Sequence, residues 1–302
     1  MTNVFKMMLA AVLVAPLAML AGTARAAGPD ATAETSTKPS IFVCGDSTSK
    51  YSGSETLQSK RQGWGTPLAL FFDPAKVTVK NVGHAGTSSL TYYRGDWPRV
   101  LPQIKSGDFV LIVFGINDGG RHTPPGIGDQ TTQGPAGPET HTYGWYMAKM
   151  ATDAEAKGAH PYFLTVTTRN IWTNPKVKFK DGTPLSALPA DYDPKDDRIE
   201  RGTGNGEYTK WTKEVGAKIH VPVFDLTNYC ADLYEKMGRE QVNKLYSDHN
   251  HTFAAGAKVV AEAIVSGLKG FKDSPFVPLL SDAGKALPTA DAKYVSDNSA
   301  GG

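Results

Sequence analysis

Short apolar runs alternate with longer amphipathic stretches along this chain of 302 residues. Apolar residues recur at helical spacing in 143–157, 208–218 and 253–268, and 97–104 is also predicted to be helical. Five other runs have the length and the β-branched or aromatic content of buried strands: 41–44, 77–82, 108–114, 161–166 and 221–226. Strands that alternate with helices predict an α/β fold, with a parallel sheet covered on both faces.

The two ends of the chain differ from this pattern. Residues 1–26 combine a basic start, an uncharged apolar run and a small-x-small sequence, which predicts a signal peptide cleaved after Ala26 and a secreted or periplasmic protein. Residues 27–39 are predicted to be a linker and 40–271 a single domain. The Pro-, Ala-, Asp- and Ser-rich residues 272–302 are expected to lie outside the core.

The charge balance excludes some classes of partner. The sequence has 32 basic and 30 acidic residues, and two of the basic ones, Lys6 and Arg25, belong to the leader. A neutral remainder gives no reason to expect nucleic acid or an anionic membrane as a partner. The apolar run of the leader is also too short for a reliable membrane span. Oligomeric state stays open.

Only two cysteines occur, Cys44 and Cys230. An exported protein permits a disulfide, and the sequence leaves open whether these two pair. Because Cys44 falls within a central strand, two separate buried thiols are favoured. No Cys/His spacing is typical of a zinc site, so no metal is expected.

The polar turns after the strands carry the candidate chemistry. Ser47 follows the first strand and is the candidate nucleophile, because turns at the carboxyl ends of parallel strands open to ligand. The same residues, Asp46 to Thr48, are also typical of a helix N-cap. Acyl transfer needs, besides a nucleophile, a base, a group that orients the base and donors for the oxyanion.

The remaining catalytic roles each have a candidate. His251 lies three residues after Asp248, a spacing that lets the carboxylate orient the imidazole towards Ser47. His249 is a rival base, although its neighbour Asp248 would orient it less well, and the Asp248–His251 pair could instead be a surface cap. The oxyanion donors are expected to be the N–H groups of Ser47 and Gly86 and the amide of Asn117. Asn117 could simply close a turn, as Asp118 is expected to do.

Four blocks resemble the GDSL or SGNH hydrolases: Gly45-Asp46-Ser47, Gly86, Gly115-Ile116-Asn117-Asp118, and Asp248-His249-Asn250-His251. Further details are similar to the rhamnogalacturonan acetylesterase branch, namely Thr48, Gly63-Trp64-Gly65, Gly107-Asp108 and Asp225-Leu226. The resemblance implies a flavodoxin-like three-layer sandwich with a five-stranded parallel sheet. It also implies a serine esterase that removes O-acetyl groups from pectic sugars, with no metal or cofactor.

The chain departs from that branch in two places. Gly86-Thr87-Ser88 stands where the branch often has Gly-Arg-Ser, so a substrate contact made by that arginine is in doubt. The long insertion 121–142 could reshape the cleft.

Three further residues are candidates for contact with an acetylated polysaccharide or oligosaccharide. His84 is close to the second turn, Arg169 follows the fourth strand and could meet an acidic sugar, and Trp172 could stack on a sugar ring or pack in the core. A broad carboxylesterase, thioesterase or lysophospholipase on the same fold is an alternative. A non-catalytic polysaccharide-binding module is another, which the complete set of four blocks disfavours.

Overall fold

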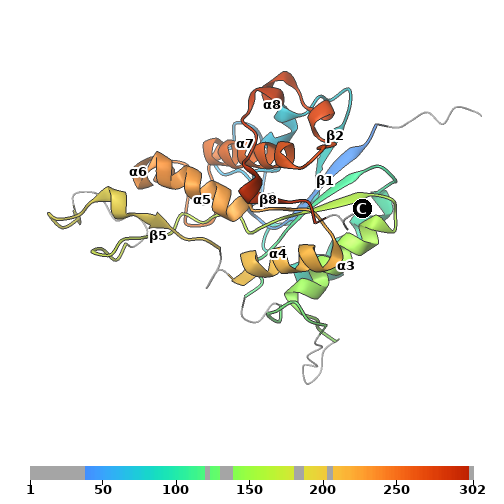
Figure 1. Ribbon diagram of the computed structural model, residues 1–302, viewed down its shortest axis with the longest axis horizontal. Coiled ribbons are helices and arrows are strands. Elements are labelled where there is room, and N and C mark those ends of the chain that lie inside the picture. Colours follow the sequence, from blue (N-terminus) through green and yellow to red (C-terminus); the bar gives the residue numbers. More distant parts are fainter. Residues whose placement is uncertain (1–37, 120–122, 130–138, 180–186, 203–206, 299–302) are drawn as a thin grey trace, which may run out of the picture. The chain divides into compact units, whose positions relative to one another are not determined.

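A six-stranded sheet runs through the computed structural model, which describes residues 38–119, 123–129, 139–179, 187–202 and 207–298 (Figure 1). The strand order is β2-β1-β3-β4-β7-β8, in which the first five strands are parallel and β8 is antiparallel. The strands are β1 Ser40–Gly45, β2 Thr78–Asn81, β3 Phe109–Val113, β4 His160–Leu164, β7 Val223–Phe224 and β8 Val295–Ser296. A separate two-stranded sheet pairs β5 Trp172–Thr173 with β6 Arg198–Ile199.

Helices cover both faces of the sheet (Figure 1). Helices α5, α7 and α8 lie on one side, and α3 and α4 lie on the other. The helices are α1 Ser89–Gly95, α2 Trp97–Val100, α3 Tyr143–Glu155, α4 Glu207–Ile219, α5 Leu226–Met237, α6 Arg239–Asn243, α7 Ala254–Gly270 and α8 Asp282–Ala286. This is the predicted three-layer α/β arrangement.

Alternation along the central strands creates the two cores. In β1, Ile41 and Val43 pack into the core beneath α5 and α7, whereas Phe42 and Cys44 pack into the core against α1 to α3. All four are fully buried. Successive side chains of a strand point to opposite faces, so a strand buried on both faces must be apolar throughout.

The two cysteines lie on opposite faces of this sheet. Cys44 belongs to the core shared with α1 to α3, and Cys230 belongs to the core beneath α5 and α7. Both are free and buried, as favoured from the sequence. Burial raises the pKa of the Cys44 thiol to about 12 and that of Cys230 further still, so both thiols stay protonated and unreactive.

Residues 272–298 contradict the expectation that the chain leaves the core after Phe271. Phe276, Leu280 and Ala290 are buried in the core beneath α7. β8 then adds a sixth, antiparallel strand beside β7, so the expectation of a five-stranded parallel sheet was wrong by this one strand. These apolar residues are spaced irregularly among Pro, Asp and Ser, so neither helical nor strand periodicity marked them as core.

Two predicted elements end earlier than expected. The predicted strand 221–226 stops at Phe224, because the Asp225 side chain accepts the backbone N–H of Asn228 and so caps α5. The predicted helix 97–104 ends at Val100 and continues as a 3₁₀ turn that contains Pro102. Residues 1–37 and half of the predicted insertion 121–142, namely 121–122 and 130–138, lie outside the described residues.

Within the described ranges, no helix combines the length and the apolar character needed to cross a bilayer.

Candidate active site

The turn after β1 presents Ser47. The backbone N–H groups of Ser49 and Lys50 both donate to the Asp46 carbonyl, at 3.1 and 3.0 Å, and the Asp46 carboxylate accepts from the N–H and hydroxyl of Thr48. These bonds close a tight turn in which Ser47 is only 8% exposed. The helix-cap interpretation of these residues is not what the structure has, because η1, the next helical element, begins at Pro67.

The loop before α7 brings His251 to this serine. His251 Nε2 lies 2.9 Å from Ser47 Oγ, although the two residues are 204 positions apart. On the other side of the ring, His251 Nδ1 lies 2.8 and 3.1 Å from the two Asp248 oxygens. A carboxylate can only accept hydrogen bonds, so Nδ1 carries the proton and Nε2 is the acceptor for the Ser47 hydroxyl. His249, the rival base, instead lines a neighbouring cavity.

A segment that carries Gly63-Trp64-Gly65 joins these two loops. The Trp64 N–H donates to the Thr48 carbonyl at 3.0 Å, which holds the serine turn. At its other end, the Gln62 N–H donates to the Thr252 carbonyl and the Thr252 hydroxyl donates to the Gln62 carbonyl, which holds the histidine loop. A Cβ on Gly63 would lie 2.4 Å from the Ser49 backbone, so only glycine permits this contact.

Asp248 and Asp46 sit near the same Ser–His pair, and their pKa values are shifted in opposite directions. Burial alone would raise the pKa of Asp248, but hydrogen bonds from the His251 ring, the His251 N–H and the Asn250 N–H outweigh it and lower the pKa. Asp46 is 1% exposed, and burial raises its pKa to about 6 despite its bonds from Thr48. Asp248 is thus the carboxylate that stays ionised beside His251.

The turns after β2 and β3 lie beside the serine turn. The His84 N–H donates to the Gly45 carbonyl at 2.9 Å, and Gly45 pairs with Val113 of β3. Gly86 has a φ of +80°, a conformation that favours glycine, and nothing lies within 4 Å of where its Cβ would be. The Asn117 amide donates to the Thr87 carbonyl at 3.1 Å, so it supports the Gly86 turn.

Asp118 has a structural role that reaches beyond the turn it was expected to close. Its carboxylate is buried and accepts both the N–H of Ser89, at 2.9 Å, and the Ser89 hydroxyl. Burial raises the pKa of Asp118, and the bonds from Ser89 oppose that rise. Asn117 and Asp118 therefore tie the third turn to the second.

Tyr51 and Arg61 also lie at this site, although no pattern in the sequence predicted them there. The Tyr51 ring packs edge-on against His251 with centroids 5.2 Å apart, and its hydroxyl accepts from Arg61 Nη1 at 2.8 Å. Arg61 Nη2 also lies 3.9 Å from Asp248 Oδ2. Both residues fall in a polar loop without periodicity, so only their three-dimensional neighbours identify them.

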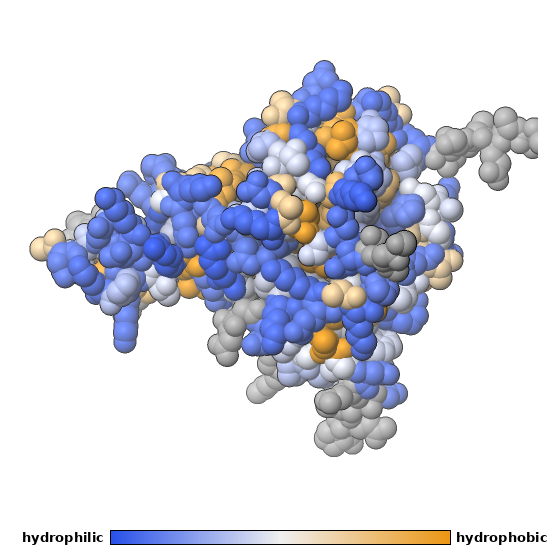
Figure 2. Space-filling view, in the orientation of Figure 1, coloured by the Kyte–Doolittle hydropathy of each residue, from blue (hydrophilic) through white to orange (hydrophobic). Residues whose placement is uncertain are grey.

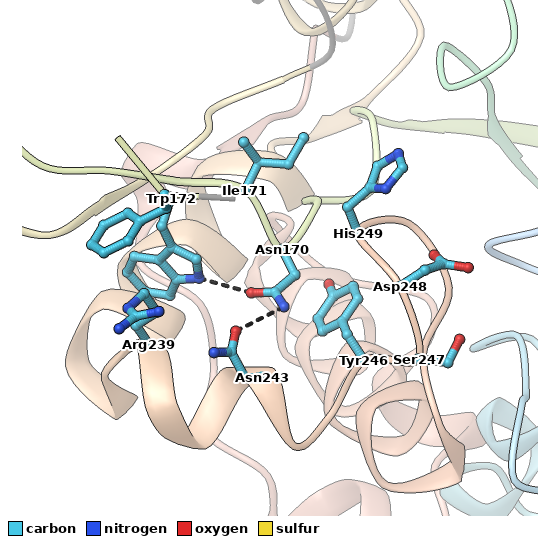
Figure 3. Close-up of a pocket in the computed structure, with 10 residues that line it drawn as sticks. Asn170, Ile171, Trp172, Arg239, Asn243, Tyr246, Ser247, Asp248 and His249 are labelled. Carbon is cyan, nitrogen blue, oxygen red and sulfur yellow. Dashed lines mark hydrogen bonds between the residues drawn. The ribbon is translucent and has the colours of Figure 1, made fainter. Parts of the chain in front are cut away.

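The three residues predicted to contact the substrate have different surroundings. His84 is exposed, and its Nδ1 lies 2.8 Å from Asp96. Arg169 makes a bidentate ion pair with Glu200, at 2.7 and 2.6 Å, so its guanidinium is already engaged. Trp172 is 6% exposed and lines the same cavity as His249 (Figure 3). The site roles of all three remain predictions.

No group of three or more His, Cys, Asp or Glu side chains within the described part of the chain has an arrangement suited to a metal ion.

Curated relatives are similar over most of the chain. A rhamnogalacturonan acetylesterase from Emericella nidulans is 28% identical over 80% of this chain and 86% of its own length. The rhamnogalacturonan acetylesterase RhgT from Bacillus subtilis is 26% identical over 76% of this chain and 89% of its own length.

Solved structures share the fold. The YxiM protein of Bacillus subtilis superposes with a TM-score of 0.57 at 23% identity, covering 77% of this chain. This chain spans only 56% of that longer protein. A variant of an acetyl-xylooligosaccharide esterase from Geobacillus superposes with a TM-score of 0.51 at 14% identity, over 78% of this chain and 95% of its own.

The family suggested by the four sequence blocks is confirmed. The sequence profile of the GDSL-like lipase/acylhydrolase family matches residues 43–259, a span that includes the serine turn and the histidine loop. The chain therefore belongs to the GDSL-like lipase/acylhydrolase family.

Proposed function

We propose that this protein is an exported serine esterase that removes O-acetyl groups from acetylated rhamnogalacturonan. The observation that carries the chemistry is the continuous hydrogen-bonded chain from Ser47 Oγ through His251 to Asp248. The substrate class rests on the relatives that are named as rhamnogalacturonan acetylesterases and match most of this chain. Export rests on the leader-like composition of residues 1–26.

The geometry supports a two-step acyl transfer. His251 Nε2 takes the proton of Ser47 Oγ as the oxygen attacks the acetyl carbonyl, and ionised Asp248 stabilises the imidazolium that forms. His251 then protonates the sugar oxygen, which leaves as an alcohol. Water, deprotonated by the same imidazole, hydrolyses the acetyl-enzyme and releases acetate.

Three donors are assigned to the oxyanion. They are the N–H groups of Ser47 and Gly86 and the side-chain amide of Asn117. Asn117 Nδ2 carries two hydrogens and uses one on the Thr87 carbonyl, which leaves the other for the substrate oxygen. Its bond to Thr87 also fixes the direction of the amide before substrate arrives, and such preorganised donors give the largest stabilisation of a developing charge.

The test measures acetate released by the purified protein from acetylated rhamnogalacturonan and, in parallel, from acetylated xylan. Ser47→Ala serves as the blank. Release from the pectic polymer alone is the expected result. Release from xylan only, or from neither polymer while small aryl acetates are cleaved, would keep the esterase chemistry and overturn the substrate.

A series of aryl esters of increasing acyl length separates the other enzymes of this fold. An acetylesterase should prefer the shortest chain. A preference for long acyl chains would instead indicate a lipid esterase or thioesterase. Oligosaccharide binding without any acetate release would indicate a binding module.

A further inference from the structure

A cavity of about 270 Å³ lies beside the loop 247–249 and shares only Asp248 with the Ser–His–Asp arrangement (Figure 3). Its volume is just below the roughly 300 Å³ at which pockets for drug-sized ligands begin, so it suits a single sugar ring better than several. Its lining comes from the segment 170–172, from Phe179, from Arg239 and Asn243 of α6, and from residues 246–249.

The cavity shares a wall with the candidate active site. Asp248 faces His251 with its carboxylate, and the loop 247–249 that carries it also forms one side of the cavity. The opposite wall follows β4 and is tied to this loop, because the Asn170 N–H donates to the His249 carbonyl at 2.9 Å. A molecule in the cavity would therefore lie next to the triad.

The lining combines aromatic rings with fixed amides. The Trp172 indole N–H donates to Asn170 Oδ1 at 2.7 Å, and the Asn170 amide donates to Asn243 Oδ1 at 3.0 Å (Figure 3). The Arg239 guanidinium lies over the Phe179 ring, with its carbon 4.3 Å from the ring centroid. Arg239 is itself buried near Asp197, with Nε 3.6 Å from the carboxylate.

This lining matches a sugar ring rather than an acyl chain. Apolar C–H faces of sugars pack on aromatic rings, and their hydroxyl groups need amide, imidazole or hydroxyl partners. A cavity for an acyl chain would instead be apolar throughout, whereas the amides of Asn170 and Asn243 place polar groups on the wall of this one.

We propose that this cavity is a carbohydrate subsite that holds the sugar residue next to the acetylated one. The proposal deepens the proposed function and rests on it for the identity of the polymer. Binding of the neighbouring sugar here would place the acetyl group over Ser47. Turnover of the polymer should therefore depend on the cavity more strongly than turnover of an aryl acetate does.

The test fills the cavity from its exposed rim. Asn243 lies at the end of α6 and is exposed, so Asn243→Trp can enter the cavity without disturbing the core. The measured quantity is the ratio of kcat/KM for acetylated rhamnogalacturonan to kcat/KM for a small aryl acetate. We expect Asn243→Trp to lower this ratio about tenfold, the loss of one ring's packing and hydrogen bonds.

Two matched variants make the result interpretable. Lys244→Trp adds the same indole at the next, exposed position, which does not line the cavity, and should leave the ratio within twofold. Asn243→Ala removes the bond to Asn170 but leaves the cavity open, and should lower the ratio less than threefold. An equal loss in Asn243→Ala and Asn243→Trp would assign the effect to that bond and overturn the subsite.

A binding measurement separates this proposal from the proposed function. Calorimetry of deacetylated rhamnogalacturonan oligosaccharides on Ser47→Ala needs no ester chemistry. We expect Asn243→Trp in that background to weaken binding about tenfold. Equal binding, or no binding to Ser47→Ala at all, would overturn the subsite. Weakened binding together with no acetate release by the wild type would instead overturn the function and leave the subsite standing.

Discussion

The serine turn after β1 and the histidine loop before α7 each place an aspartate beside the Ser47–His251 pair, and they hold these two carboxylates in opposite ways. Asp248 accepts three hydrogen bonds from the His251 ring and two backbone N–H groups and keeps a partly exposed side chain. Asp46 is fully enclosed and bonds to Thr48 within its own turn.

The two aspartates are therefore placed for different tasks: Asp248 to orient the His251 ring, and Asp46 to hold the serine turn. The pKa of Asp248 is lowered, so its charge is available to stabilise an imidazolium, whereas burial raises the pKa of Asp46 to about 6. Asp46 instead closes the turn that presents the serine. These contacts support our proposal that Asp248, and not Asp46, orients His251.

The largest expected loss of activity comes from replacing Ser47, which the serine turn presents and which His251 contacts. Ser47→Ala should lower kcat by at least about 10⁴-fold, because no nucleophile remains to form the acetyl-enzyme. Steady-state hydrolysis of an aryl acetate measures this, and far-UV circular dichroism checks the fold. Ser52→Ala, an exposed serine of the same loop, is the control. Turnover retained in Ser47→Ala would remove Ser47 from the mechanism.

The next largest loss of activity is expected from a change at Asn117, in the turn after β3. Asn117→Ala should lower kcat about 10²- to 10³-fold, the usual scale for one oxyanion donor. Since Asn117 also bonds to Thr87, thermal unfolding is measured alongside the kinetics. A loss below about fivefold would mean that the amide acts only in closing the turn.

The two carboxylates should also differ in how they change the free energy of unfolding with pH. A raised pKa means that native Asp46 binds its proton more tightly than the unfolded chain does, so its contribution to stability is greatest below about pH 4 and is lost as the pH rises towards 6. Asp46→Asn lacks this titration. Relative to the wild type, its free energy of unfolding should therefore rise by about 2 kcal/mol across that range.

Denaturant unfolding from pH 4 to pH 7 measures this difference, and the exposed Asp291→Asn is the control. A difference that does not change with pH would contradict a raised pKa at Asp46. Asp248 should behave in the opposite direction. Because its pKa is lowered, the stability that it contributes is present above the ordinary aspartate pKa and is lost as the pH falls through its own value.

The smallest effect concerns Arg61. Its Nη2 lies 3.9 Å from Asp248, and both side chains are partly exposed, so solvent screens the pair and it contributes little. Arg61→Gln should therefore lower kcat/KM by no more than about fivefold, and 0.5 M salt should reduce even this difference. Lys60→Gln is the neighbouring control. A loss above about 50-fold would make Arg61 a functional part of the triad.

That Ser47, His251 and Asp248 lie together could be predicted from the sequence, because the signals for these three residues are local. Ser47, Asp248 and His251 stand in short blocks whose local spacing fixes their geometry, since the Asp248 carboxylate reaches both the N–H and the ring of His251 three residues later. Four of the parallel strands, β1, β3, β4 and β7, were likewise predictable, because strands buried on both faces are nearly continuously apolar. The edge strand β2 is only partly buried and was predicted from its alternation and β-branched residues.

The missed parts depend on contacts between distant segments. Tyr51 and Arg61 meet His251 and Asp248 across some 200 residues of chain, and no periodicity in their polar loop marks them. The same is true of Phe276 and Leu280, which complete the core from a Pro-rich tail. Arg169 was placed correctly after β4, but its pairing with Glu200 could not be inferred from either segment alone.

The most direct test of the role of Asp248 compares two isosteric variants, Asp248→Asn and Asp46→Asn, in the rate of aryl acetate hydrolysis at pH 7. We expect Asp248→Asn to lower kcat about 10⁴-fold, because an amide no longer stabilises the imidazolium or the correct tautomer of His251. Asp46→Asn should lower kcat less than tenfold. Equal losses, or a larger loss in Asp46→Asn, would contradict the assignment of Asp248 as the carboxylate of the triad.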